Sequence, residues 1–109
     1  MAGYPEGSGQ TIAEVVGSIP GPFKYQHINS NATTVVKAAP GFLHSIVVNQ
    51  AGSSWVAEIF DSTSASGTIV ANSINISLVT SFIYDITLNT GITIVTSGTT
   101  PGDITVVWR

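Results

Sequence analysis

Apolar and polar side chains alternate along most of this chain, in short runs that turn-forming residues separate. A period of two places successive side chains on opposite faces of a β-strand. No stretch has a convincing helical period, and turn signals recur at roughly the 8 to 12 residue spacing typical of sandwiches and barrels. The pattern therefore predicts an all-β protein. The expected strands are residues 24–28, 33–38, 41–50, 54–61, 68–76, 81–88, 91–97 and 103–109.

The strand signals begin only after a region rich in glycine and proline. Residues 1–10 contain almost nothing to bury, and the prolines before the first strand would stop any helix. The intervening segment TIAEVVGSI, residues 11–19, could form a short strand or a helical turn. We predict a flexible, extended N-terminal arm over residues 1–22. One antiparallel β-sandwich domain, of jelly-roll type, should follow over residues 23–109.

The alternation also predicts which face of each strand is buried. The last strand and the strand over residues 81–88 each have one strongly apolar face. In residues 54–61 both faces are partly apolar, so this strand should be central or covered by a neighbour. We expect Trp55 and Phe60 to hold the sandwich together. The side chains expected to share a buried face are Phe82, Tyr84, Ile86 and Leu88 in one strand, and Ile104, Val106 and Trp108 in the other.

Charged residues are scarce, at 8% of the chain against roughly a quarter in ordinary domains. The only cations are Lys24, Lys37 and Arg109, and the net charge is −3. Because three cations cannot neutralise a run of phosphates, we expect no direct binding to nucleic acid. A neutral, hydroxyl-rich surface suits close protein neighbours, so we interpret this composition as a sign of assembly.

The apolar runs have the length of strands, and none approaches the roughly 18 residues of a membrane span. We therefore expect no membrane partner. The stretch MAGYPEGSGQ has neither a basic region nor an apolar run, so we expect no secretory signal and synthesis in a cytoplasm. The absence of cysteine removes disulfides and thiol chemistry.

A dense group of hydroxyl side chains lies in WVAEIFDSTSASGTIVA, residues 55–71. Asp61 and Ser62 can bond their own backbone, and Gly67 can adopt a positive φ. A hairpin loop therefore accounts for the group. We interpret it as a turn unless a base activates one of its hydroxyls.

Activation of a serine requires a base within hydrogen-bond reach, and only His27 and His44 could serve. His44 alternates with Phe42, Ile46 and Val48, which indicates a packed or edge histidine. His27 stands at the end of a predicted strand. We therefore predict that the protein is not an enzyme, with no catalytic residue, no cofactor and no metal site.

The acids allow one alternative to this prediction. Asp61, Asp85 and Asp103 could bind calcium together with backbone carbonyls, because loop sites in β proteins need no fixed spacing. These acids and Glu58 sit on different predicted elements. We therefore favour scattered surface acids over a metal site or a pair of catalytic carboxylates.

The aromatic residues allow a second alternative. Trp55, Tyr84 and Trp108 could form a platform on which a sugar stacks. Large aromatic side chains at alternating strand positions are more often core or interface, however. We favour the core interpretation and keep carbohydrate binding as an alternative.

Three elements of the chain resemble a class of small virion proteins of tailed bacteriophages. The first is a G-x-L-H-x-I-x-V opening, the second a DxTSASGT hairpin over residues 61–68, and the third a final strand pair over residues 90–109. The resemblance covers residues 31–109 and is one of strands and turns, not of a catalytic motif. The positions that match the opening are Gly41, Leu43, His44, Ile46 and Val48.

This resemblance implies a β-sandwich that acts as a capsid decoration or cement protein. Such a protein would sit on the outside of the head as a homotrimer and bridge subunits of the major capsid protein. It would be made in the host cytoplasm and located on the capsid surface of the virion. The alternatives are a carbohydrate- or receptor-binding module of a tail fibre, and a structural protein of the neck or tail.

An extended arm could widen the reach of such a protein, because ten extended residues span roughly 33 Å. We expect the segment from residue 4 to residue 19 to contact the capsid or another subunit. The candidate interaction residues are Tyr4, Ile12, Val15, Val16, Ile19 and Tyr25.

Overall fold

A computed structural model describes residues 22–109, and every regular element in this range is a β-strand. The predicted arm lies outside the described residues except for Pro22. The strands are β2 (Lys24–Ile28), β3 (Ala32–Lys37), β4 (Gly41–Gln50), β5 (Ser53–Asp61), β6 (Thr68–Asn75), β7 (Ser81–Leu88), β8 (Ile92–Thr100) and β9 (Asp103–Trp108).

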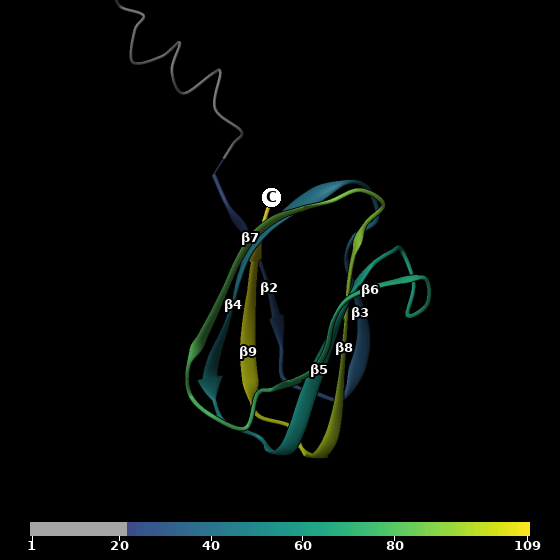
Figure 1. The fold of residues 1–109 in the computed structure, drawn as a ribbon. Coiled ribbons are helices and arrows are strands. Elements are labelled where there is room, and N and C mark those ends of the chain that lie inside the picture. Colours follow the sequence, from purple (N-terminus) through teal and green to yellow (C-terminus); the bar gives the residue numbers. More distant parts are fainter. Residues whose placement is uncertain (1–21) are drawn as a thin grey trace, which may run out of the picture.

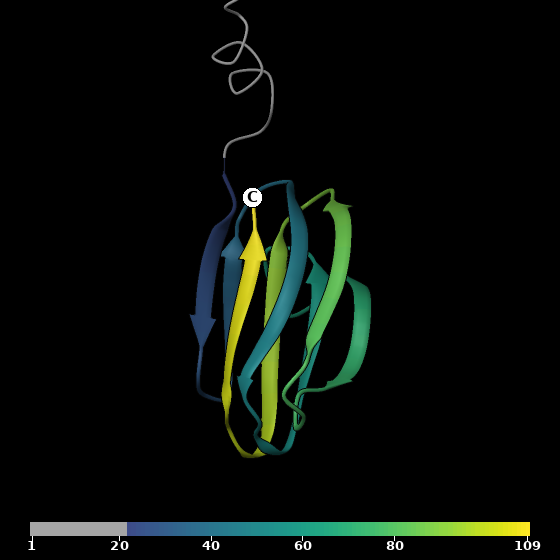
Figure 2. The same ribbon diagram turned by 90° about the vertical axis from the view of Figure 1, so that its left-hand side faces the viewer.

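The strands form two four-stranded antiparallel sheets that face each other (Figure 1, Figure 2). One has the order β2-β9-β4-β7 and is called the β2-sheet here, and the other, the β3-sheet, has the order β3-β8-β5-β6. Only β5 and β6 are neighbours both in sequence and in a sheet. Every other connection between described strands crosses to the opposite sheet. The prediction of an all-β antiparallel sandwich is confirmed.

The first described strand pairs with the last. Lys24 lies opposite Trp108, and Ile28 lies opposite Ile104. The next pair inward, β3 and β8, repeats this arrangement in the other sheet. Most strand pairs therefore join parts of the chain that are far apart in sequence.

Side chains from both sheets fill the space between them. Trp55 is fully buried, and its indole N–H donates a hydrogen bond of 2.8 Å to the side-chain oxygen of Asn31. Phe60 is 7% exposed. Both residues are buried as predicted, although Phe60 lies outside the main core cluster. That cluster consists of Ile28, Val36, Leu43, Ile46, Val48, Trp55, Ala57, Ile59, Ile76, Leu88, Ile92, Ile94, Ile104 and Val106.

The predicted faces of β5, β7 and β9 are confirmed. In β7 exposed and less exposed positions alternate up to the buried Leu88. In β9 the residues Ile104 and Val106 are fully buried and Trp108 packs against the core cluster. Strand β5 is central in its sheet, between β8 and β6, which explains why both of its faces are largely covered.

His44 is a histidine at the sheet surface, one of the two placements expected, but its expected alternation with Ile46 and Val48 is wrong. The pairing of β4 with both neighbours shifts between Leu43 and Ser45, so the alternation breaks at this point. After the shift Ile46 and Val48 lie in the core, whereas the His44 ring stacks on Phe23 outside it. A β-bulge adds one residue to a strand and so reverses the face of every later side chain.

The end predicted for strand β8 is also wrong. The strand was expected to end at residue 97, but β8 continues to Thr100, which lies opposite Ser53. Gly98 has a φ of 148° and lies opposite Trp55 within the strand pair. A glycine inside a strand can mark a close approach of another backbone.

The outermost strands β6 and β7 are both irregular. Ser73 in β6 and Asp85 in β7 have positive φ values of 54° and 51°, at points where the register of the strand shifts. Bulges of this kind twist an edge strand and interrupt its row of free backbone groups. These two edges are thus poor templates for a further strand.

Candidate functional site

The serine cluster forms the loop between β5 and β6, and it is a turn as predicted. The Ser62 hydroxyl accepts a hydrogen bond of 3.2 Å from the backbone N–H of Ser64, whose own hydroxyl lies 2.9 Å from that of Ser66. Gly67 has a φ of 98°, as the turn requires. Within residues 22–109, no serine or threonine hydroxyl hydrogen-bonds to either histidine ring.

Asp61 bonds a different part of the backbone from the one expected. Its carboxylate accepts hydrogen bonds from the N–H groups of Asn89 and Thr90, at 3.0 and 2.8 Å, and from Gly91 at 3.4 Å. These bonds favour the charged form, led by the one from Asn89, and they lower the pKa of Asp61 below its ordinary 3.8. Asp61 therefore ties the β5–β6 hairpin to the β7–β8 loop.

We expect Asp61→Asn to flatten the dependence of stability on acid pH. A carboxylate whose pKa is lowered on folding stabilises the protein fully above its unfolded pKa, and this contribution disappears as the pH falls through the folded pKa. Urea denaturation at several values between about pH 2 and pH 5 measures the effect. Glu58→Gln on the same strand is the matched control, because Glu58 forms no side-chain hydrogen bond within residues 22–109. An unchanged acid slope in Asp61→Asn would contradict this assignment.

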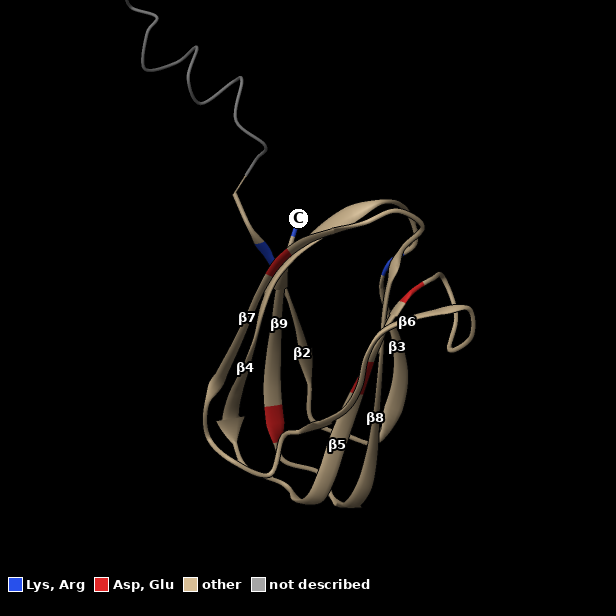
Figure 3. Cartoon of the chain, viewed as in Figure 1, with Lys and Arg blue, Asp and Glu red and all other residues tan. Residues whose placement is uncertain are grey.

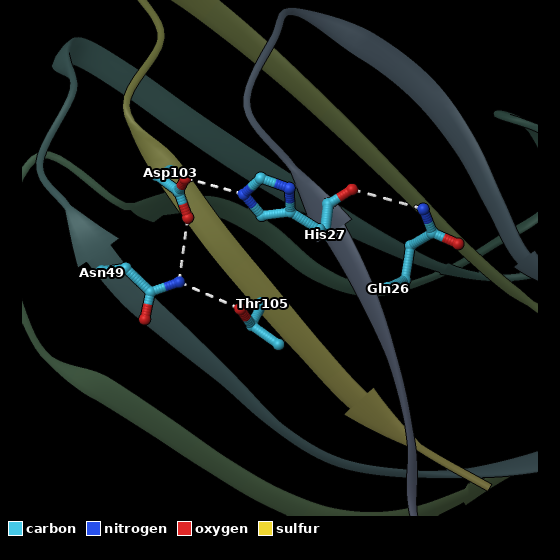
Figure 4. Close-up of polar contacts among 5 residues, drawn as sticks. All are labelled: Gln26, His27, Asn49, Asp103 and Thr105. Atoms are coloured by element: carbon cyan, nitrogen blue, oxygen red, sulfur yellow. Dashed lines mark hydrogen bonds and ion pairs between the residues drawn. The ribbon is translucent and has the colours of Figure 1, made fainter.

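A polar cluster on the β2-sheet joins three strands (Figure 4). His27 Nε2 lies 2.7 Å from a carboxylate oxygen of Asp103, and the Asn49 amide donates to the other oxygen at 2.9 Å. The same amide also donates to the Thr105 hydroxyl at 2.9 Å. The bonds from Asn49 and then His27 lower the pKa of Asp103. This cluster holds β2, β9 and β4 together.

The second histidine is also paired with an acid. His44 Nδ1 hydrogen-bonds to the Asp85 carboxylate across the bulges of β4 and β7. The His44 ring stacks on Phe23, with ring centroids 4.6 Å apart. Both histidines are thus held by a carboxylate at the sheet surface.

A pocket of about 410 Å³ opens beside Phe23. The Arg109 guanidinium lies 4.6 Å from the centre of the Phe23 ring and 4.7 Å from that of Phe42, a distance typical of cation–π contacts. Phe42 and Arg109 also pair through backbone hydrogen bonds of 2.7 and 2.9 Å. The pocket is lined by Lys37, Pro40, Gly41, Phe42, Thr87 and Arg109, and its lining is mostly apolar.

All three cations gather at the end of the sandwich where the chain reaches Arg109 (Figure 3). Lys24 and Lys37 lie 5.6 and 5.7 Å from the centre of the Trp108 ring, and Lys37 and Arg109 line the pocket. We call this region the cationic end. The sequence places these residues far apart, so only the pairing of distant strands reveals the cluster. Likewise, no sequence pattern indicated that Phe42 and Phe23 would lie at this site.

The proposed aromatic platform is not exposed. Trp55 is fully buried, and Tyr84 and Trp108 pack against the core cluster. Burial also raises the pKa of the Tyr84 hydroxyl. The Trp108 indole nitrogen is buried and has no hydrogen-bond partner among residues 22–109. Because Trp55 is fully buried, the three rings do not form one exposed platform.

The acids do not converge in the part of the chain that the structure describes. No group of three or more histidine, cysteine, aspartate or glutamate side chains lies close enough there to hold a metal ion. Asp61, Asp85 and Asp103 each bond a different partner.

Five of the six candidate interaction residues, Tyr4, Ile12, Val15, Val16 and Ile19, lie outside the described residues. The sixth, Tyr25, is 76% exposed on strand β2. Four residues lie side by side across the sheet and form what we call the outer row. Tyr25 of β2 pairs with Val107 of β9, Val107 pairs with Ser45 of β4, and Ser45 pairs with Ile83 of β7. Ile83 is 62% exposed. This outer row crosses all four strands of the β2-sheet, the sheet that faces the viewer in Figure 2.

No helix among the described residues is long and apolar enough to cross a membrane. Comparison of the chain with protein-family models, with curated proteins and with solved structures found no match.

Proposed function

We propose that this protein is a structural protein of a bacteriophage virion that decorates the capsid. The resemblance to small phage virion proteins supports the proposal, because its three motifs coincide with whole elements of the fold. The G-x-L-H-x-I-x-V motif lies in β4, the DxTSASGT motif is the β5–β6 hairpin, and residues 90–109 contain β8 and β9. No catalytic activity, cofactor or metal is part of the proposal.

The single observation that carries the proposal is the outer row on the β2-sheet. Tyr25 and Ile83 stand at its two ends and are mostly exposed, and the half-buried Val107 and the buried Ser45 lie between them. The row itself carries no charged side chain, and a large exposed aromatic side chain such as Tyr25 is suited to a protein surface, since little charge must be desolvated where the row makes contact. Aromatic side chains are also enriched at the centres of such contacts.

We further propose that the sandwich is a jelly roll. Eight strands in two four-stranded sheets, with all but one connection crossing between the sheets, support this topology. The same architecture is suited to repeated assembly, because its faces and loops stay free while the two sheets bury each other.

The partners in this proposal are the major capsid protein and two further copies of the chain in a homotrimer. The protein would be made in the host cytoplasm and would act on the outer capsid surface of the virion. It would contact neither nucleic acid nor a membrane.

Binding to capsid shells tests the proposal. Purified protein is mixed with shells that lack it, the shells are pelleted, and the pellet is imaged by electron microscopy. Ile83→Lys should weaken binding about tenfold or more, because it places a charge in a desolvated contact. Ile69→Lys on β6 is the matched control, since Ile69 is also half-exposed but belongs to the other sheet.

Regular density on the head lattice would support the decoration role. Failure of the unchanged protein to bind shells, together with retention on a glycan array or labelling of a tail, would favour the alternatives of a receptor-binding module or a neck or tail protein. If both lysine variants bind shells equally well, the outer face of the β2-sheet is not the surface that contacts the capsid.

A further inference from the structure

The pocket at the cationic end has the chemistry of a site for an apolar segment that carries an acid. Phe42, Pro40 and the alkyl stem of Lys37 offer apolar surface, and Lys37 and Arg109 supply positive charge at its rim. Among the described residues, every acid except Glu58 is engaged in a hydrogen bond. No acid is among the residues that line the pocket, whereas two of the three cations are.

The part of the chain outside the described residues contains a matching segment. Residues 1–21 carry two acids, Glu6 and Glu14, and neither lysine nor arginine. Glu14 lies within TIAEVVGSI, where apolar residues flank it in the sequence. Those residues are Ile12, Val15, Val16 and Ile19. One acid among four apolar residues is complementary to two cations beside an apolar pocket.

The segment is joined to the sandwich close to this pocket. Phe23, the residue before β2, has its ring centre 6.3 Å from that of Phe42, which lines the pocket. The seven steps between neighbouring residues from Val16 to Phe23 can span up to roughly 23 Å. The arm of one copy can therefore reach the cationic end of a copy beside it.

The intervening sequence opposes a return of the segment to its own pocket. A tight reversal at Pro20-Gly21 is often closed by a hydrogen bond from the N–H of residue 22, which Pro22 lacks. Gly21, the third residue of such a turn, also precedes Pro22, and a residue before proline disfavours the α-helical backbone angles that a common turn needs there. Short linkers that resist folding back favour exchange between copies.

We infer that residues 11–19 of one copy dock in the pocket at the cationic end of a second copy, with Glu14 facing Lys37 and Arg109. This inference deepens the homotrimer of the proposed function and rests on it. The contact is head-to-tail, so a ring forms when the rotation between copies closes. In a closed ring of three copies, each pocket would then hold the arm of a neighbouring copy.

Cysteine cross-linking of the full chain tests the docking, because the natural sequence has no cysteine. Val16→Cys marks the segment and Thr87→Cys marks the pocket lining. Co-expressed single variants should form a disulfide-linked dimer under mild oxidation. The matched control replaces Thr87→Cys with Asn72→Cys, an exposed position on β6 of the other sheet, and should give only background cross-linking.

The double variant Val16→Cys, Thr87→Cys identifies the occupant. A ladder of linked dimers and trimers supports docking in a second copy. A cross-linked monomer would show that the segment docks in its own chain and would overturn the inference. Cross-linking no stronger than with Asn72→Cys would also overturn it.

Charge variants give a second measurement. Sedimentation in solution, without shells and without introduced cysteines, compares the self-association of each variant with that of the unchanged chain. Glu14→Gln should weaken self-association about two- to fivefold, whereas Glu6→Gln should leave it unchanged. Equal effects of the two changes would contradict the pairing of Glu14 with the pocket. Cross-linked trimers that fail to bind shells would keep the docking and reject capsid decoration, and shell binding without cross-linking would reject the docking alone.

Discussion

Replacing Trp55 with alanine should lower the free energy of unfolding by about 3–5 kcal/mol, the range for removing a large aromatic side chain from a core. Trp55 is fully buried in the central strand β5, so the two sheets would face each other across a cavity. Loss of the indole N–H would also leave the side-chain oxygen of Asn31 without its hydrogen-bond donor. Asn31 is exposed, so water can replace that bond and most of the loss comes from packing. Chemical denaturation followed by circular dichroism measures the change.

Two variants separate packing from hydrogen bonding. Trp55→Phe keeps most of the ring volume but loses the N–H, and we expect a cost of about 1–2 kcal/mol. Tyr25→Ala removes an exposed aromatic side chain from β2 and should change stability by about 0.5 kcal/mol or less. A loss in Trp55→Ala no larger than that of Tyr25→Ala would show that Trp55 does not support the core.

Gly98→Ala should destabilise the sandwich by about 3 kcal/mol or more. A Cβ atom at this position would lie 2.7 Å from the Trp55 Cα and 2.8 Å from the Ser54 carbonyl carbon, and still closer to the Ser54 carbonyl oxygen. These are backbone atoms of the paired strand, so they cannot turn aside as a side chain could. The φ of 148° adds strain for any residue with a Cβ. Thermal unfolding of the variant measures the loss.

Gly67→Ala is the matched control for Gly98→Ala. Gly67 also has a positive φ, of 98°, but it lies in the exposed β5–β6 loop. A Cβ there would approach only the Ser62 side chain, at 3.4 Å or more. We expect a cost of about 1 kcal/mol from backbone strain alone. If both alanines cost the same, the close approach of β5 and β8 at Gly98 would not be the cause.

Most of the fold could be predicted from the sequence because each strand carries its own local signal. Alternation identified β7 and β9 and their buried faces, and the partly apolar faces of β5 indicated a central strand. Local signals fail where the backbone departs from regular pleating. The bulge beside His44 reversed the expected face of the residues after it, and β8 continues through Gly98 where its end was expected. Neither feature has a sequence pattern of its own.

The candidate site was harder to predict because its residues meet only through distant pairing. Phe42 and Arg109 are far apart in sequence but share backbone hydrogen bonds across β4 and the end of β9. Asp61 was expected to bond nearby backbone and instead bonds Thr90. Tyr25 was singled out and is exposed, whereas the contacts of the arm residues stay a prediction.

The pairing of β2 with β9 also sets a condition on how the protein is made. His27 and Asp103 are bonded across 76 positions of the chain, so this contact does not exist until the ribosome has translated nearly the whole domain. At roughly 5–20 residues per second, the early strands wait about 4–15 s for their partners. During that interval both β2 and β3 expose unpaired edges, and β2 has no register shift, whereas the pairing of β3 with β8 shifts once, between Val35 and Lys37. Lys24 of β2 and Lys37 of β3 are then the main charges that discourage premature contact between nascent chains.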